Sequence, residues 1–302
     1  MENSNPLVSF IMLSYNQSSY IEDAIISSLN QEYDKIEYII SDDFSTDDTL
    51  YKIKKTVGDF NEEKDIQVLD NKSNLGLVGN LNRALSVAKG DIIVLAAGDD
   101  ISLNDRVEKT VNYFVNNDDL SFLSFNDLIL MDNTKTNEKV HEIKDDMIIS
   151  FEDFFSSPFS YFSGASRAFK RDVYIKYGDL NENCPTEDTP YIFRCLTLGK
   201  GLVSSTPGIY YRKHSNNLSS SSNVARMDVN EIASQYERDL NLSLSHGLID
   251  RVNARKFEIW MDFKNMTKNF SREKKLINKI CTTIKFSCRN PLFRKWVMSK
   301  FL

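Results

Sequence analysis

The chain has 302 residues, of which 41% are apolar and 26% are charged, and its net charge is −6. This composition is ordinary for a globular protein with a substantial core, and the cysteine count excludes a dense disulfide framework. No CxxC metal pattern occurs either, so we predict buried reduced thiols at the four cysteines: Cys184, Cys195, Cys281 and Cys288. Because the N-terminus is polar and no run of about 18 uncharged apolar residues is present, we expect no secretory signal, no membrane span and a cytoplasmic location.

Apolar runs of strand length alternate with helix-period segments through the first half, which predicts an α/β fold with a mostly parallel sheet flanked by helices. Strands are predicted at residues 8–13, 36–40, 66–69, 92–96 and 121–131. Helices are predicted from Ser18 or Ser19, at 50–57 and at 77–88. The run at 92–96 is apolar throughout and indicates a central strand. Residues 132–144 are typical of a polar loop, 151–162 form an aromatic-rich segment expected to shape an acceptor pocket, and 223–270 have helical spacing.

Three predicted strands end on polar or acidic residues, in the segments 14–16, 42–43 and 98–100. In open α/β sheets ligands bind at the carboxyl ends of the strands, so these segments are expected to meet at one site. The glycine-rich phosphate loops GxGxxG and GxxxxGK[ST] are absent. A nucleotide diphosphate would then be neutralised by Mg²⁺ or Mn²⁺ held on carboxylates, for which Asp99 and Asp100 are suited. Adjacent acids after Gly98 also form ordinary turns and helix caps, which is the alternative.

Several short motifs occur in a fixed order: the segments 10–16, 39–49, 74–76, 88–91 and 98–100, with Asn82 among them. Together they closely resemble the inverting family-2 glycosyltransferases, which have the GT-A fold, and the resemblance covers roughly residues 6–215. Further along, Thr186-Glu187-Asp188 with Arg194 resembles the acidic acceptor-site motif of that family. Residues 211–214, Tyr-Arg-Lys-His, with Asn217 resemble its Tyr-Arg-x-His segment.

The resemblance implies a nucleotide-sugar donor, with UDP favoured at Asp43, which would accept a hydrogen bond from the base. The donor-binding residues that it implies are Tyr15, Asn16, Asp43, Asn74, Asn82, Asp100 and Arg212, the last meeting the diphosphate. It implies Asp99 as the ligand of a Mn²⁺ or Mg²⁺ cofactor, with His214 as a second ligand. The structural alternatives are an N-cap for Asp43, turn or packing roles for Asn74 and Asn82, and a surface position for His214.

Asp188 is the expected general base, with Glu187 beside it as a second catalytic residue. Inversion by a single displacement needs a carboxylate on the face opposite the leaving nucleotide, to take the proton of the acceptor hydroxyl. A neighbouring acid raises the pKa of a carboxyl group towards a useful value. Asp188 is also expected to open a helix after Pro185, and a simple N-cap is the alternative. The family often has an acid where Ala97 stands here, so metal dependence is less firmly implied than sugar transfer.

The expected domains are a catalytic domain at 1–220, with a donor-binding half at 1–131 and an acceptor-binding half at 132–220, and a helical extension at 221–302. Residues 219–222 are expected to form a mobile lid. Residues 264–302 carry eleven Lys or Arg and one acidic residue. This basic and apolar tail favours an anionic membrane surface as a partner. A nucleic acid is not expected, because proteins that bind nucleic acids usually carry basic charge on the rest of the chain too. A solvated helical face or an oligomer contact is the alternative.

The expected function is transfer of a sugar to a glycan or lipid-linked acceptor, in the synthesis of a cell-surface polysaccharide such as an O-antigen or capsule. The enzyme would work as a peripheral protein at the inner face of a bacterial membrane. A nucleotide-sugar-binding or scaffold protein without activity is one alternative, supported by Ala97. A sugar nucleotidyltransferase is disfavoured, because residues 14–19 contain neither the glycine nor the basic residue of its usual loop.

Overall fold

The structure is a computed structural model that describes residues 5–60, 64–131, 133–156, 162–214, 227–272 and 290–301. Contacts divide the chain into two compact units, Met1–Gln235 and Tyr236–Leu302. The sequence places the boundary at residue 220, whereas the contacts place it within helix α8 (Val229–Ser245). Gln235 remains with the first unit because its side-chain oxygen accepts a hydrogen bond from the Asn181 N–H at 2.7 Å. Asn217, Cys281, Cys288 and the predicted lid at 219–222 lie outside the described residues.

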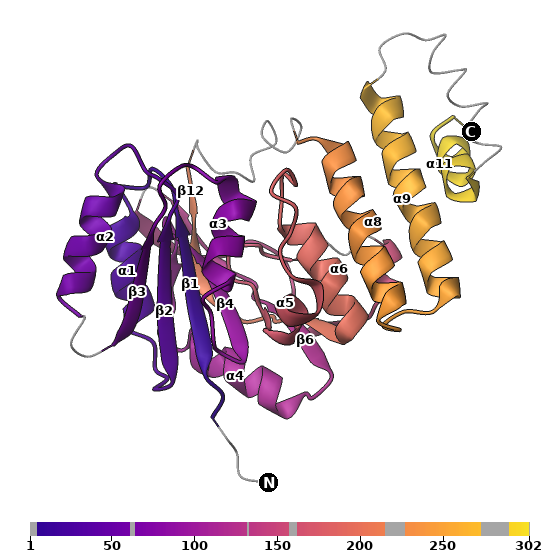
Figure 1. The fold of residues 1–302 in the computed structure, drawn as a ribbon. Helices are drawn as coiled ribbons and strands as arrows, with labels where there is room; N and C mark the ends of the chain where they lie inside the picture. The colour runs from indigo at the N-terminus through magenta and orange to yellow at the C-terminus, as the bar shows by residue number, and fades with distance from the viewer. Residues whose placement is uncertain are drawn as a thin grey trace. The chain divides into compact units, whose positions relative to one another are not determined.

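The first unit is built on an eight-stranded sheet in the order β3-β2-β1-β4-β10-β6-β11-β9. Figure 1 shows β3, β2, β1 and β4 side by side. The strands are β3 (Asp65–Asp70), β2 (Ile36–Asp42), β1 (Val8–Ser14), β4 (Ile92–Ala97), β10 (Ala168–Lys170), β6 (Leu120–Ser124), β11 (Lys200–Val203) and β9 (Met147–Ile149). The first four are parallel, β10 is antiparallel to both of its neighbours, and β9 is antiparallel to β11. The predicted α/β fold is confirmed, and β4 is the interior strand that the apolar run at 92–96 predicts.

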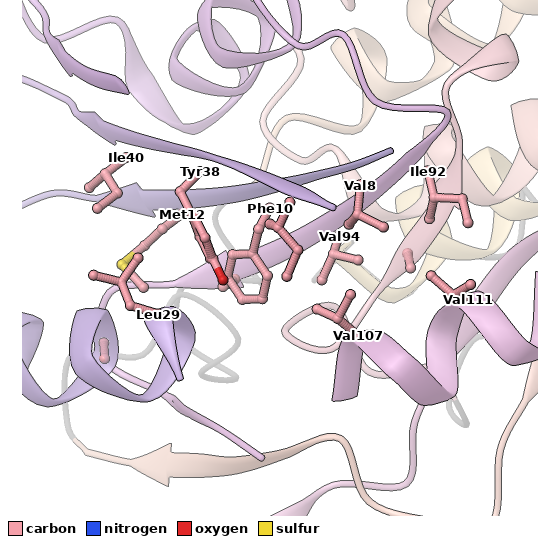
Figure 2. Close-up of a cluster of buried hydrophobic side chains, with 14 of the residues drawn as sticks. Val8, Phe10, Met12, Leu29, Tyr38, Ile40, Ile92, Val94, Val107 and Val111 are labelled. Atoms are coloured by element: carbon pink, nitrogen blue, oxygen red, sulfur yellow. The ribbon is translucent and has the colours of Figure 1, made fainter. Parts of the chain in front are cut away.

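The core lies where alternate side chains of the parallel strands meet three helices (Figure 2). These helices are α1 (Ile21–Leu29), α2 (Thr49–Gly58) and α4 (Arg106–Asn116). Phe10 and Val94 point into this cluster, as does Val107 of α4. Side chains alternate along a strand, so Ile11 is buried on the other face, where α3 (Gly76–Leu85) packs on β1 and β2. Both faces of the parallel strands are covered, which explains their continuous apolar runs.

The remaining elements of the first unit are α5 (Asp172–Tyr177), α6 (Asp188–Leu198), the 3₁₀ turn η1 (Glu152–Ser156) and a second sheet. The second sheet has the order β5-β12-β7-β8, with β5 (Ile101–Ser102), β12 (Ile209–Lys213), β7 (Leu128–Met131) and β8 (Thr134–Lys139). Two predictions are wrong here. The strand predicted at 121–131 is broken between β6 and β7, where Asn126 and Asp127 turn away to bond other segments. The polar loop predicted at 132–144 contains β8, an edge strand whose side chains are mostly exposed and therefore polar.

The second unit contains most of α8, α9 (Arg251–Arg272) and α11 (Pro291–Phe301), in agreement with the helical spacing predicted up to residue 270. Tyr236 and Trp260 pack around Phe257, and Phe270 packs against Phe293 of α11. Asn290 caps α11 by accepting the N–H groups of Leu292 and Phe293 at 3.0 and 3.1 Å. None of the described helices combines the length and apolar character that crossing a membrane requires.

Two glycines provide a test of the packing between β1 and the turn before β4. A Cβ on Gly90 would lie 2.4 Å from the Ser9 nitrogen and 2.8 Å from the Val8 carbonyl carbon, so Gly90→Ala forces backbone atoms apart. We expect it to lower the free energy of unfolding by about 2–3 kcal/mol. A Cβ on Gly58, the last residue of α2, would have nothing within 4 Å. Gly58→Ala should therefore raise the free energy of unfolding by about 0.5–1 kcal/mol. Urea denaturation of both variants measures the difference, and equal stabilities would contradict this account.

Candidate active site

The loops after β1 and β2 are joined by hydrogen bonds through Asn16. The Asn16 side-chain oxygen accepts from the Thr46 N–H at 2.8 Å, and the Asn16 N–H donates to the Ser45 hydroxyl at 2.9 Å. Ser45 is itself held by Asp42, which accepts its N–H at 2.9 Å. Asn16 adopts a left-handed φ of 50°, which asparagine tolerates better than most residues. Asn16, predicted to bind the donor, thus connects the two loops beside Tyr15 and Asp43.

Asp43 is a buried carboxylate in a group of loops that also carry exposed apolar side chains. Its Oδ1 accepts from the Leu75 N–H at 2.8 Å, and its own carbonyl accepts from the Asn74 side chain at 3.3 Å. The structure therefore brings Asp43 and Asn74 together, and Tyr15, Phe44 and Leu75 expose 47%, 48% and 37% of their surface in the same loops. Phe44 has a φ of 62°, a strained conformation for a bulky side chain that often marks a functional loop. The sequence did not single out Phe44, because its chemistry gives no sign of its backbone angle.

Asp99 and Asp100 follow β4 where that strand approaches the loop after β1. A Cβ on Gly98 would lie 2.7 Å from the terminal methyl of Ile21, so glycine permits this approach. The Asp99 Oδ2 lies 2.8 Å from the His214 Nε2. The Asp100 Oδ1 accepts the backbone N–H of Arg212 at 2.8 Å. The two adjacent acids thus hold the end of β12, and the predicted pair of Asp99 and His214 is brought together across 115 residues of sequence.

Arg212 lies beneath Asp99. Its Nε donates to the Asp99 carbonyl at 2.7 Å, another guanidinium nitrogen bonds the side chain of Asn133, and its guanidinium lies 4.6 Å from the ring centroid of Tyr20. Tyr20 also stacks on His214, with ring centroids 5.3 Å apart. We call the turn that carries Asp99 and Asp100 the acidic turn. Arg212 holds this turn in position through these contacts, a role that the sequence did not predict. The sequence analysis also missed Tyr20. It predicted the start of helix α1 at Ser18 or Ser19, which would place Tyr20 inside the helix, whereas α1 begins at Ile21 and Tyr20 precedes it.

The acidic turn has the chemistry of a divalent-metal site. Carboxylate oxygens suit Mn²⁺ and Mg²⁺, and an imidazole nitrogen favours Mn²⁺ of the two. The Asp100 Oδ2 is buried and has no hydrogen-bond partner among the described residues. Burial, together with the negative charge of Asp99, raises the pKa of Asp100 well above its usual value, which a nearby cation would reverse. In the described part of the chain no three or more His, Cys, Asp or Glu residues converge as a metal site, so Asp99 and His214 would need oxygens from a bound diphosphate.

Glu187 and Asp188 share one buried arginine. Asp188 is the first residue of α6, as predicted, and its side chain is 46% exposed. The Arg167 Nη1 lies 2.6 Å from the Asp188 Oδ1, and its Nη2 donates to the Glu187 Oε1 at 2.8 Å. Burial and the charge of Asp188 raise the pKa of Glu187 to about 7, against the opposing effect of Arg167. Sequence reasoning missed Arg167, whose one signal is a basic residue directly before an apolar strand.

A pocket of about 110 Å³ opens beside Asp188. It is lined by Phe122, Phe162, Ser163, Gly164, Arg167, Asp188, Thr189 and Ile192. The rings of Phe122 and Phe162 meet edge to face with centroids 5.0 Å apart. Phe162 is the one described residue of the predicted aromatic segment that lines this pocket, whereas Phe151 and Phe154 pack against Phe193. An aromatic wall beside a carboxylate is suited to a sugar, whose apolar face packs on rings while its hydroxyls bond to charged groups.

Asn82 and Arg194 support the segment that leads to Asp188. Both ends of the Asn82 amide bond the backbone of Leu180, at 2.8 and 3.0 Å. The Arg194 Nη1 donates to the Gly178 carbonyl at 2.8 Å. Cys184 is buried and donates its S–H to the Thr186 carbonyl at 3.1 Å, and Cys195 is also buried. Asn82, predicted near the donor sugar, anchors the loop before Glu187 and Asp188 in the structure.

Two fully buried charged residues lie near the acidic turn, and the sequence did not single out either. Asp127 accepts the N–H of Ile209 at the start of β12, and burial raises its pKa to about 6. Arg106 donates to the Leu95 carbonyl and to the Ser102 hydroxyl, and burial lowers its pKa to about 10. Asp127 and Asp100 thus hold the two ends of β12, with the Arg106 charge close to both.

Residues 9–178, more than half of the chain, match the model of a family described as glycosyl transferase family 2. The chain is 34% identical over 128 residues to the UDP-Glc:alpha-D-GlcNAc-diphosphoundecaprenol beta-1,3-glucosyltransferase WfgD of Escherichia coli. That alignment covers 42% of this chain and 48% of WfgD. The chain spans less than half of the length of several curated relatives that it matches, with shares between 36% and 48%.

Solved structures resemble the chain over most of its length. Residues 1-349 of S. aureus TarS in complex with UDP-GlcNAc give a TM-score of 0.61 at 16% identity, over 94% of this chain and 91% of that chain. The mannosyltransferase PcManGT from Pyrobaculum calidifontis, in complex with GDP-Man and Mn²⁺, gives 0.57 at 16% identity, over 98% and 84%. Similarity at this identity concerns the fold alone. With the family match and this architecture, the chain belongs to glycosyl transferase family 2 and has the GT-A fold.

Proposed function

We propose that the chain is an inverting glycosyltransferase that moves a sugar from a UDP-sugar to a hydroxyl of a lipid-linked glycan. The observation that carries this proposal is the half-exposed Asp188 carboxylate beside the aromatic pocket, in a family-2 chain whose acidic turn lies at the end of β4. WfgD, by its name, uses UDP-glucose and a diphosphoundecaprenol-linked sugar. The acceptor class and a role in cell-surface polysaccharide synthesis are proposed on that similarity.

The donor nucleoside is proposed to bind between the loops after β1 and β2. Asp43 has one oxygen committed to the Leu75 N–H, so its carboxylate has a fixed orientation towards a base. Tyr15 and Phe44 offer exposed rings beside it on which a base can stack. Asn74 and Asn16 hold this frame through the hydrogen bonds of the two loops.

The diphosphate is proposed to bind at the acidic turn. Asp99 and His214 would hold a divalent cation there, with Asp100 behind them. When bound, this cation supplies positive charge to the leaving diphosphate. Arg212 and Tyr20 keep the Asp99 backbone and the His214 ring in place. Ala97 stands where the family motif often has a carboxylate, so Asp99 and His214 would hold the cation with more help from the diphosphate oxygens.

Asp188 is proposed to accept the proton of the acceptor hydroxyl. As that oxygen forms its bond to the anomeric carbon, the bond from this carbon to the diphosphate breaks, and UDP leaves from the opposite face. One displacement inverts the anomeric centre. The pocket beside Asp188 excludes part of the solvent, which favours the acceptor hydroxyl over water as the attacking group.

A nucleotide-sugar-binding protein without activity is the second candidate, and Ala97 is the feature that favours it. The two candidates differ in turnover, not in donor binding. Release of UDP from UDP-sugars, with and without Mn²⁺ and a lipid-linked acceptor, separates them. Binding without any release of UDP would support the non-catalytic candidate.

Asp188→Asn should abolish most of the transfer while leaving the donor site intact. General-base catalysis contributes about 10²–10⁴-fold, so we expect a loss of at least about 100-fold in kcat. Binding of UDP, measured by calorimetry, should change by less than about twofold, because the donor loops are separate from α6. Asp172→Asn is the matched control, since Asp172 also opens a helix and is exposed. Full activity in Asp188→Asn would refute the assignment of the base.

Asp99→Asn and His214→Ala should each weaken the metal dependence of UDP binding. Losing one of two protein ligands is expected to raise the Mn²⁺ concentration at half-saturation by about 10-fold or more. Calorimetric titration of UDP at a series of Mn²⁺ concentrations measures this, and chelation with EDTA should be reversed by added Mn²⁺. His246→Ala, at an exposed histidine, is the control. An unchanged Mn²⁺ requirement in both variants would exclude this metal site.

The C-terminal tail is proposed to bind an anionic membrane and so to bring the enzyme to the inner membrane face. In α11, Arg294 and Lys295 are exposed, and so are the apolar Leu292 and Met298. One basic residue near such a surface contributes about 1 kcal/mol, so Lys295→Glu should weaken binding to anionic vesicles by at least about fivefold. Co-sedimentation measures this, with Lys176→Glu on exposed α5 as the control. Unchanged binding would favour a solvated face or an oligomer contact for the tail.

A further inference from the structure

We propose that Arg167 is a positioning residue for the transfer reaction: its buried positive charge pairs with the Asp188 carboxylate and turns one of its oxygens towards the acceptor. This inference rests on the proposed function, in which Asp188 is the base. The Arg167 side chain lies behind the carboxylate and is only 3% exposed. It would act on the acceptor only through Asp188.

The position of Arg167 is fixed by the main sheet. Its carbonyl accepts the N–H of Leu95 in β4 at 2.9 Å, and β10 begins at the next residue. Its guanidinium then meets the acidic pair from inside, with Nη1 towards Asp188 and Nη2 towards Glu187. A planar guanidinium that directly precedes an interior strand fixes the direction of a carboxylate more tightly than a lysine could.

The two oxygens of Asp188 have different surroundings. Oδ1 is buried, faces Arg167, and would lie 2.7 Å from a Cβ placed on Gly164. Because the side chain is nonetheless 46% exposed, its exposed oxygen is Oδ2. Arg167 therefore holds Oδ1. A Cβ on Gly164 would crowd both oxygens, at 2.7 and 3.1 Å, so glycine leaves room for the carboxylate, and Oδ2 is left for an acceptor hydroxyl in the pocket that these residues line.

The charges around Arg167 explain why one cation matters here. Burial by itself lowers the pKa of Arg167, but Asp188 and Glu187 outweigh it, so the pKa is raised and the guanidinium stays charged. Two other titratable groups close to it are the Cys195 thiol and the Tyr191 hydroxyl, and burial raises the pKa of both, so both are neutral. One positive charge thus serves two neighbouring carboxylates, and without it they would tend to share a proton.

A purely structural role explains this cluster poorly. The Arg167 Nε and the Glu187 Oε2 are buried without a hydrogen-bond partner among the described residues. Each such atom costs about 1–3 kcal/mol, and well-packed apolar residues often stabilise a core better than a buried ion pair. A costly ionic cluster at the edge of a pocket is typical of a functional site.

The test compares the pH dependence of kcat/KM in Arg167→Met, Arg167→Lys and Glu187→Gln. On the acidic side activity falls because the base becomes protonated. We call the acidic side of the pH profile its acidic limb. Without the guanidinium the base is protonated more easily, so in Arg167→Met we expect the acidic limb to move up by about one pH unit or more, with kcat reduced by at least about 10-fold. Arg167→Lys keeps the charge and should keep the limb near its original pH. Because the pKa of Glu187 is raised to about 7, this carboxyl is mostly neutral on the acidic side, so Glu187→Gln should leave the limb near its original pH.

An unmoved limb in Arg167→Met, with any loss of kcat, would overturn the proposal, because a merely structural role lowers activity without moving the profile. Should Arg167→Met fail to fold, by circular dichroism and thermal melting, the decision passes to Arg167→Gln, which removes the charge but keeps a polar side chain. An upward shift of the limb there supports the charge coupling, and no shift overturns it. UDP affinity should be unchanged in all variants that fold.

A readout without turnover separates this proposal from the proposed function. Asp188 can be followed by carbon NMR of ¹³C-labelled aspartate, assigned by the signal that disappears in Asp188→Asn. Its titration midpoint should move upward in Arg167→Met or Arg167→Gln. If these shifts occur but no sugar is transferred, the proposed function fails while the role of Arg167 stands. If transfer occurs but the midpoints stay in place, the role of Arg167 is refuted.

Discussion

The pairing of β4 inside the main sheet is the constraint on which the candidate site depends. Leu95 is paired with Ile11 of β1, and its N–H also bonds the carbonyl of Arg167. The Leu95 carbonyl accepts the buried guanidinium of Arg106. Four residues later the same strand leads into Asp99. One interior strand thus carries the acidic turn directly and holds the arginine behind Asp188 by a backbone bond. Any displacement of β4 would disturb both sides of the site.

The second sheet completes the acidic turn through buried polar contacts. β12 is held by Asp127 at Ile209 and by Asp100 at Arg212, and the chain then presents His214 to Asp99. Burying carboxylates is costly unless each has a partner, and here the backbone N–H groups of one strand provide partners. The same region raises the pKa of Asp127 to about 6. The first unit therefore gives up some stability to place an imidazole beside a carboxylate.

The acceptor side uses the same principle with a different partner. Asp188 and Glu187 stand at the start of α6, and Arg167 is the buried cation between them. Asn82 fixes the preceding loop by bonding both polar groups of Leu180. A half-exposed acid on a helix end is mobile in principle, and these contacts reduce its freedom. For the proposed base this would lower the entropic cost of the reaction.

The sequence by itself determined the parallel half of the sheet, because strands buried on both faces give apolar runs whose period and length are local properties. It also determined which residue types stand at the strand ends, and the ordered motifs identified the family. The roles of Asp99 and Asp188 stay predictions. Only the tertiary structure decided the break between β6 and β7, since a continuous apolar run cannot show that two strands enter different sheets. It alone revealed Arg167 behind Asp188, Tyr20 on His214 and Arg212 beneath Asp99. These pairs join residues far apart in sequence, and whether two such side chains meet depends on strand register and packing, which no local pattern encodes.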